Sequence, residues 1–151
     1  MFKADSTSLN RRKLLALAAS AMGASFVTPA FAAPDLVVVV HPSVGEAISM
    51  ADLGAIFTTR KQSWNGGKRI VPFNFPAKHE VRVAFDEAVL GMDPDAVARY
   101  WIDRKIRGGN PPPKQITTAQ LVVRLVEKLE GAIGYVPKGT DLGSTRLAMT
   151  L

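Results

Sequence analysis

The sequence of 151 residues has no cysteine, and its only histidines are His41 and His79. Without thiols the chain forms no disulfide bond and offers no thiolate to a metal, so an apolar core has to stabilise the fold. Zinc needs three or four His, Cys or carboxylate ligands, and no local cluster supplies them. We therefore expect no metal site and no cofactor.

Basic and aromatic residues do not gather in any one segment. Of the net charge of +6, residues 1–32 supply +3 from four basic residues and one acid, which leaves +3 for residues 33–151. In that part the basic residues are scattered among twelve acids, without a Lys/Arg run or a ladder of aromatic side chains. A nucleic-acid groove needs such a cluster, so we expect no nucleic-acid partner.

No apolar run is long enough to cross a membrane as a helix. The uncharged stretch Leu14–Val27 follows a basic segment and precedes the small-x-small site Ala30–Ala32. These are the three parts of a secretory signal peptide, with cleavage expected before Ala33.

Two export routes fit this segment. Asn10–Leu15 contains adjacent arginines and resembles a twin-arginine export signal, while an ordinary secretory signal that holds two arginines fits as well. On either route, residues 1–32 are predicted to be a signal peptide cleaved near Ala32. Residues 33–151 are predicted to form one periplasmic domain.

Apolar periodicity divides the remaining chain into strands and helices. Leu36–Val40 reads LVVVV, a β-branched run typical of a strand covered on both faces. Ser49 and Asp52 form a capping box before the apolar face of a first helix, and Thr117 stands in the same relation to Gln120 before the last. The pattern predicts a three-layer α/β domain with about four mostly parallel strands and four helices. We expect helices at about 49–57, 79–90, 93–105 and 117–129, and strands at 36–40, 70–73, 132–136 and 146–151.

The first two strands flank the first helix. Leu36–Val40 and Ile70–Phe73 are therefore predicted to form a parallel βαβ unit with a right-handed crossover. Ligands bind such sheets beyond the carboxyl ends of the strands, near the starts of the following helices. This rule points to residues 41–49 and 74–82.

Three further features have structural interpretations. Trp64 stands in a polar turn, and we expect it to lie over the edge of the domain. Asp86 and Glu87 are interpreted as charges on a helix surface. Residues 107–114, RGGNPPPK, exclude helix and central strand, and predict either an ordered surface connection or a loop that docks a partner.

Seven short segments occur in a characteristic order and spacing between residues 36 and 136. They are Leu36–Val40, Asp52–Phe57, Trp64–Gly67, Ile70–Phe73, Ala84-Phe85, Tyr100-Trp101 and Gly131–Val136. Together these segments resemble the periplasmic phosphate-binding proteins of ABC transporters, and more closely the short, single-lobe relatives of that group.

This resemblance implies an αβα single lobe of the periplasmic-binding-protein type, which binds without catalysis. In the family, a Ser-Gly-Thr loop preceded by an arginine holds the anion, at the start of the helix after the strand equivalent to Ile70–Phe73. The corresponding loop here, Asn74–Glu80, has neither the Ser-Gly-Thr sequence nor the preceding arginine. Because this loop departs from the family's pattern, the anion binding that the resemblance implies is expected to be weak or altered.

Five residues are candidates for ligand binding. Helix N–H groups and cationic side chains attract anions, which selects Lys78, His79 and Arg82 at a predicted helix start. Asn74 adds a polar contact, and Ser43 has the equivalent position after the first strand. A solvated helix end and a turn-capping hydroxyl at Ser43 are the alternatives. We expect no catalytic residue, because the sequence contains no nucleophile elbow.

Two functional hypotheses follow. The first is an exported, non-enzymatic solute-binding module of the kind that delivers phosphate or another small oxyanion to an ABC transporter. The second is a periplasmic protein-interaction domain that kept the lobe scaffold and lost the ligand. Its partner would be a periplasmic or membrane protein.

Overall fold

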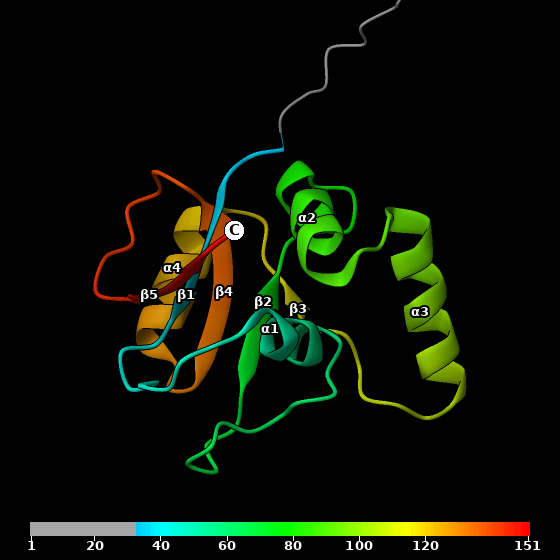
Figure 1. Cartoon of the computed structure of the whole chain (residues 1–151), viewed down its shortest axis with the longest axis horizontal. Coiled ribbons are helices and arrows are strands. Elements are labelled where there is room, and N and C mark those ends of the chain that lie inside the picture. The colour runs from blue at the N-terminus through cyan, green and yellow to red at the C-terminus, as the bar shows by residue number, and fades with distance from the viewer. Residues whose placement is uncertain (1–32) are drawn as a thin grey trace, which may run out of the picture. The chain divides into compact units, whose positions relative to one another are not determined.

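Five strands form one mixed sheet in the computed structural model, which describes residues 33–151 (Figure 1). The expected signal peptide, residues 1–32, lies outside the described residues. The order across the sheet is β3-β2-β4-β1-β5. The strands are β1 (Leu36–Val40), β2 (Val71–Asn74), β3 (Lys114–Gln115), β4 (Ala132–Pro137) and β5 (Arg146–Thr150).

Four of the five strands run in one direction, and β1 runs in the other. Strand β2 pairs parallel with β3 and β4, whereas β1 pairs antiparallel with both β4 and β5. The expected α/β class with mostly parallel strands is confirmed, but the predicted parallel βαβ unit from β1 to β2 is wrong. A run of buried β-branched residues suits any strand covered on both faces, so the composition of β1 carries no information about its direction.

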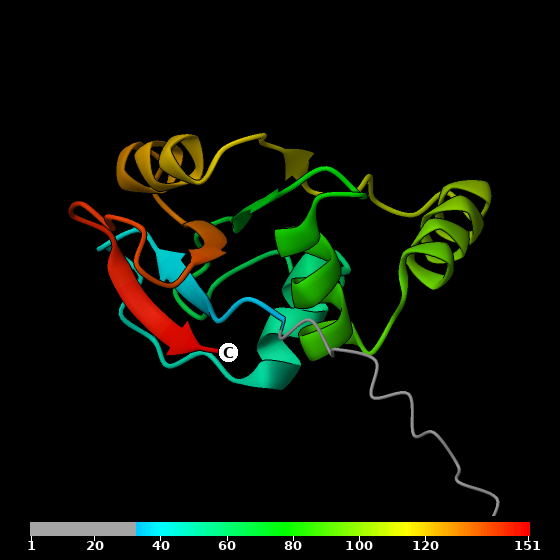
Figure 2. The ribbon, with the colours of Figure 1, turned by 90° about the horizontal axis from the view of Figure 1, so that it is seen from above.

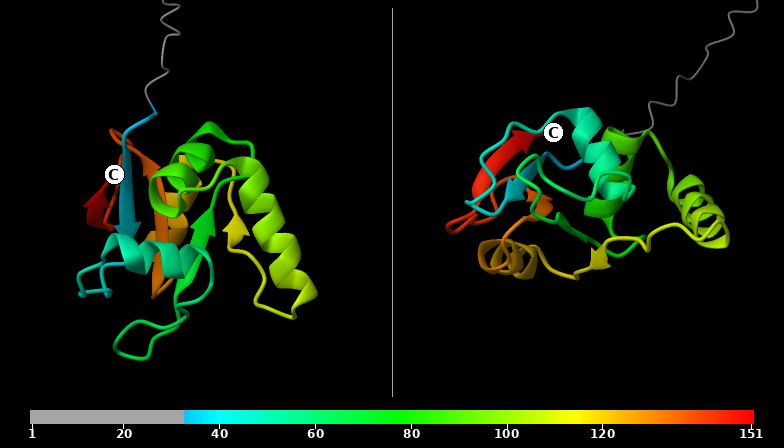
Figure 3. Two further views of the ribbon diagram at one scale, coloured as in Figure 1. Left: turned by 45° about the vertical axis from the view of Figure 1, so that its right-hand side comes forward. Right: turned by 90° about the horizontal axis from the view of Figure 1, so that it is seen from below.

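Four α-helices surround the sheet, as expected from the apolar patterns. Figure 2 shows α4 on one face of the sheet and α1 with α2 on the other, which gives three layers. In Figure 3, α3 stands to the side of the sheet, and the chain then returns to β3. Within residues 33–151, no helix is long and apolar enough to cross a membrane. The helices are α1 (Met50–Phe57), α2 (Glu80–Phe85), α3 (Pro94–Ile106) and α4 (Ala119–Lys128).

Two helix boundaries differ from the prediction. Helix α2 does not continue as α-helix to its predicted end, because residues Asp86–Leu90 form a π-helix, η1, which ends at Gly91 with φ of 62°. Helix α4 is capped by Thr118, whose side chain accepts from the N–H of Leu121, and not by Thr117. The two threonines are adjacent, and only the backbone conformation determines which hydroxyl reaches the first turn.

Alternate residues of β4 pack against helices on opposite faces of the sheet. A Cβ atom at Gly134 would lie 2.6 Å from Val122 Cγ1, so α4 packs directly on this glycine. The next residue, Tyr135, points the other way, and its ring stacks on Phe85 at 3.7 Å between centroids and meets the edge of Phe57 at 5.5 Å. The fully buried strands β1 and β4 are therefore the centre of the core.

The predicted capping box of α1 is present. Ser49 Oγ accepts from the N–H of Asp52 at 3.1 Å, and the Asp52 carboxylate accepts from the N–H of Ser49 at 3.0 Å. Lys61 Nζ donates to the same carboxylate at 3.0 Å. The hydrogen bond from the Ser49 backbone, followed by that from Lys61, lowers the pKa of Asp52 from 3.8 to about 2.

Replacing the Asp52 carboxylate is expected to lower the stability of the protein only at pH values at which the carboxylate is charged. Asp52→Ala should lower the free energy of unfolding by about 1 kcal/mol at neutral pH. A depressed pKa in the folded state stabilises above the unfolded value of 3.8, and this contribution is lost as the pH falls through about 2. Urea unfolding of the wild-type protein and the variant at neutral pH and near pH 2 measures the loss of stability under both conditions. Asp35→Ala, which removes an exposed carboxylate, is the control, and an equal loss at both pH values would contradict the prediction.

Trp64 is buried, with 5% of its surface exposed, so its expected place over the edge of the domain is wrong. Its indole N–H donates to the carbonyl oxygen of Gly131 at 3.0 Å. The turn that carries it folds back on itself through a bridge between Ser63 and Arg69. A contact between residues this far apart in the chain leaves no local signal in the sequence.

Candidate functional site

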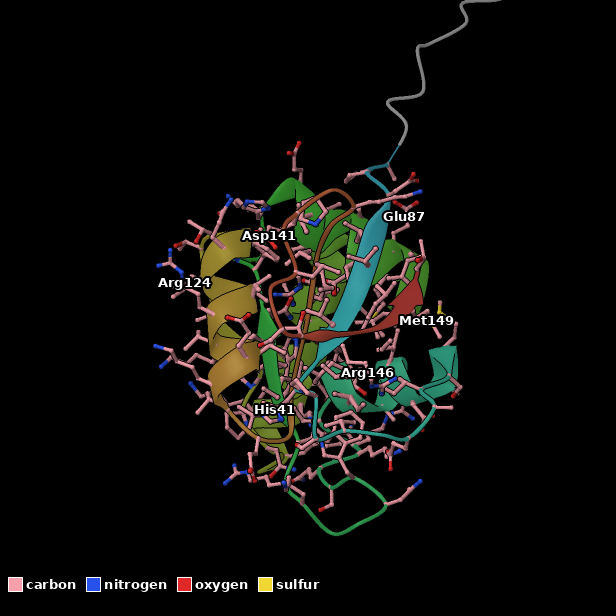
Figure 4. The ribbon with its side chains drawn as sticks, turned by 90° about the vertical axis from the view of Figure 1, so that its left-hand side faces the viewer. His41, Glu87, Arg124, Asp141, Arg146 and Met149 are labelled. Carbon is pink, nitrogen blue, oxygen red and sulfur yellow. The ribbon has the colours of Figure 1, made fainter. Side chains whose placement is uncertain are left out.

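The carboxyl ends of the parallel strands lie together at one edge of the sheet. Asn74 at the end of β2 pairs with Gln115 at the end of β3. Because β1 runs the other way, its carboxyl end lies at the opposite edge, where Val40 is level with Ile133 near the start of β4. Figure 4 shows this separation, with His41 at one end of β1 and Glu87 of η1 toward the other.

Ser43 is consequently not brought together with the other four candidates. It lies in an exposed turn, with Oγ 2.7 Å from His41 Nδ1, and its own N–H donates to the same nitrogen at 3.0 Å. This local arrangement agrees with the alternative interpretation of Ser43 as a turn-capping hydroxyl.

Asn74 is buried at the edge where the carboxyl ends of β2 and β3 lie. Its side-chain oxygen already accepts two hydrogen bonds. That oxygen accepts from the N–H of Phe75 at 3.0 Å and from the hydroxyl of Tyr135. Burial raises the pKa of Tyr135, so its hydroxyl stays protonated and remains a donor. Asn74 thereby connects β2 to β4.

His79 and Lys78 flank the start of α2 in different environments. The His79 side chain caps the helix, because its Nδ1 accepts from the N–H of Val81 at 3.2 Å, and its ring packs on Phe75 at 4.7 Å between centroids. Lys78 is exposed. Since a side chain of the chain itself takes a first-turn N–H, the helix start is not an open anion site.

Arg82 is buried in an ion pair. Its Nε donates to Asp86 Oδ2 at 2.5 Å and its Nη1 donates to the carbonyl oxygen of Phe75 at 3.0 Å. Arg82 and Asp86 are each 4% exposed, and within residues 33–151 no hydrogen-bond donor reaches the other carboxylate oxygen, Asp86 Oδ1. Burial raises the pKa of Asp86 although the positive charge of Arg82 opposes this shift.

Asp86 was not selected from the sequence, and its interpretation as a surface charge is wrong. The available signal was its spacing from Arg82, because residues four apart are neighbours on a helix and an Arg–Asp pair at this spacing is favourable. The neighbouring Glu87 is exposed, as expected.

A cavity of about 200 Å³ lies beside this ion pair. It is bounded by α2 and η1, by α3 and by the loop before β3, beyond the carboxyl ends of β2 and β3. Its lining includes one cation and one anion, so the formal charge of its wall is zero. The residues that line it include Ala77, Arg82, Asp86, Val97, Trp101 and Gln115.

The lining of the cavity is mostly apolar, and its one cation and one anion are paired with each other. A pocket for a drug-sized molecule has a volume of about 300–1,000 Å³, so the cavity is small for an organic ligand. In the part of the chain that the structure describes, no group of three or more His, Cys, Asp or Glu residues is arranged to bind a metal ion.

Comparisons with known proteins support the fold. No protein-family model and no curated protein match the chain. Among solved structures it is similar to an ABC-type phosphate transport receptor from Vibrio cholerae, with a TM-score of 0.60 and 14% sequence identity. The match covers 76% of this chain and 46% of the receptor, so the chain spans about half the receptor's length. At this identity the likeness establishes a distant resemblance of fold.

Proposed function

We propose that this protein is an exported, non-enzymatic binding module that holds phosphate or another small oxyanion weakly in the cavity beside Arg82. The observation that carries the proposal is a buried guanidinium at a small cavity beyond the carboxyl ends of parallel strands. The likeness in fold to a phosphate transport receptor supports it. The signal-peptide pattern of residues 1–32 supports a periplasmic location.

Binding is proposed to be weak because Asp86 competes with the solute for Arg82. The carboxylate already accepts a hydrogen bond from the guanidinium, and its negative charge repels an anion in the same cavity. Lys78 stands exposed at the start of α2 and contributes positive charge near the cavity only through solvent.

Removing the negative charge of Asp86 is therefore expected to strengthen oxyanion binding. Asp86→Asn should tighten phosphate binding about tenfold, because one repulsive unit charge near the cavity disappears while a hydrogen-bond acceptor for Arg82 remains. Arg82→Gln should abolish binding. Isothermal titration calorimetry of the purified protein with phosphate measures both, and Glu87→Gln, which removes an exposed carboxylate next to Asp86, should leave the affinity unchanged.

The pH dependence of the affinity for sulfate gives a second test. The charge of sulfate stays constant in mild acid, so a change in affinity reports on the protein. The wild-type protein should bind sulfate more tightly as the pH falls and Asp86 takes up a proton, whereas Asp86→Asn should lose this dependence. The absence of heat for both the wild-type protein and Asp86→Asn at millimolar anion would refute the proposal.

A protein-interaction role is the second candidate. One observation favours it, namely that Ile102 and Ile106 of α3 are 61% and 80% exposed and stand four residues apart on one helix. A periplasmic or membrane protein that covers this face would account for it. Under this alternative, the phosphate and sulfate titrations stay flat for every variant.

A further inference from the structure

The loop before β3 also forms one wall of a second, larger cavity. Pro112 and Pro113 line this cavity and the one beside Arg82, so the loop separates the two. The second cavity has a volume of about 420 Å³ and lies between the end of α1, the turn that follows it and the start of β2. This volume is within the range of about 300–1,000 Å³ for small-molecule sites.

The wall of the larger cavity is mostly apolar, and all its charged lining residues are cations. Lys61 is already paired with Asp52 at 3.0 Å and Glu46 at 3.6 Å. Arg69 and Lys114 form no ion pair with any residue of the described part of the chain. The positive charge of the lining therefore comes mainly from these two side chains. The apolar wall includes Ile56, Ile70, Val71, Pro72 and Pro111–Pro113.

Thr59 lines the same cavity and combines an unusual backbone conformation with a buried polar atom that has no partner. Its backbone is in the left-handed region, with φ of 58°, which is unfavourable for a β-branched residue. The residue is 9% exposed, and within residues 33–151 its buried Oγ1 has no hydrogen-bond partner. Strained backbone and unpaired buried polar groups occur preferentially at binding and catalytic sites.

The backbone of Thr59 also connects the cavity to its outer wall. Its carbonyl oxygen accepts from Arg104 Nη2 at 3.2 Å and from Asn110 Nδ2 at 3.5 Å. These bonds connect α3 and the proline loop to the end of α1. The unusual conformation of Thr59 is thus part of what holds the cavity in shape.

We propose that this second cavity binds a small organic carboxylate with an apolar body. Arg69 and Lys114 attract the carboxylate, and the prolines with Ile70 pack on the apolar body. This site is separate from the oxyanion cavity beside Arg82. It therefore does not depend on the proposed phosphate binding.

A matched pair of ligands tests the proposal on the purified protein. We expect 3-phenylpropionate to bind saturably and 3-phenylpropanamide to bind about tenfold more weakly, because only the acid pairs with the two cations. Arg69→Gln and Lys114→Gln should each weaken binding of the acid about threefold, and the double variant should bind acid and amide alike. In nuclear magnetic resonance titrations, the shifts should concentrate on the lining residues, Thr59 among them.

Lys128→Gln and Lys138→Gln are the matched controls. Each removes an exposed cation on another surface and should leave the affinity unchanged. Asp86→Asn, which alters the cavity beside Arg82, should also leave it unchanged, which separates this proposal from phosphate binding. Equal binding of acid and amide by the wild-type protein, an equal loss in the control variants, or no saturable binding at millimolar acid would each overturn it.

Discussion

Arg82→Met is expected to lower the free energy of unfolding by about 3–5 kcal/mol at neutral pH. The substitution keeps much of the side-chain volume but removes the ion-pair partner that Asp86 has within residues 33–151, where its side chain is buried. Asp86 Oδ1 already lacks a donor among the described residues, so the variant leaves the whole buried carboxyl group without a partner. Urea unfolding followed by circular dichroism measures the loss.

The double variant Arg82→Met/Asp86→Leu separates two contributions to the loss of stability. One is the loss of the ion pair, and the other is the burial of a carboxyl group without a partner. Replacing both members of a buried ion pair by apolar residues of similar size is often neutral, so the double variant should recover most of the stability. If it is as unstable as Arg82→Met alone, the guanidinium stabilises the fold mainly through its bond to the Phe75 carbonyl oxygen.

The pH dependence of Arg82→Met has a definite sign. Burial already raises the pKa of Asp86 in the wild-type protein, so its contribution to stability is full below the unfolded value of 3.8 and is lost as the pH rises through the folded value. Without Arg82 the folded pKa rises further. The stability difference between the variant and the wild-type protein should therefore shrink in acid, where Asp86 is neutral in both.

Gly131→Ala is expected to destabilise the protein by about 2–5 kcal/mol, through two separate costs. Gly131 has φ of 80°, which costs an alanine about 1–2 kcal/mol. An added Cβ would also overlap the carbonyl oxygen of Arg69, a backbone atom that cannot turn away, for a further cost of about 1–3 kcal/mol. The carbonyl of Gly131 accepts from the indole of Trp64 and from the N–H of Val71, so movement there disturbs both.

A comparison with Gly67→Ala isolates the second cost, the steric overlap with Arg69. Gly67 has nearly the same φ, 81°, but no atom lies within 4 Å of the Cβ that a substitution would add. Its loss should be about 1–2 kcal/mol, from the backbone conformation alone. Thermal and urea unfolding of both variants give the comparison, and equal losses would show that Arg69 accommodates the methyl group.

Local patterns predicted the four helices and four of the five strands, but neither β3 nor how the strands meet. The capping box at Ser49 depends on residues three apart, so it could be derived from the sequence. The antiparallel direction of β1 depends on β4, almost a hundred positions further along the chain, and no pattern within Leu36–Val40 specifies that partner. Ser43 and Asn74 lie at opposite edges of the sheet for this reason, because reversing one strand moves its carboxyl end to the other edge.

The sequence by itself determined the α/β class, the four helices and the resemblance to a periplasmic-binding-protein lobe, because each rests on side-chain patterns within short segments. Only the tertiary structure decided what the basic residues near Asn74 do. Arg82 is committed to Asp86, His79 caps its own helix and Lys78 is left in solvent. The sequence alone does not show whether a charged side chain is paired or free, because the packing around that side chain decides it.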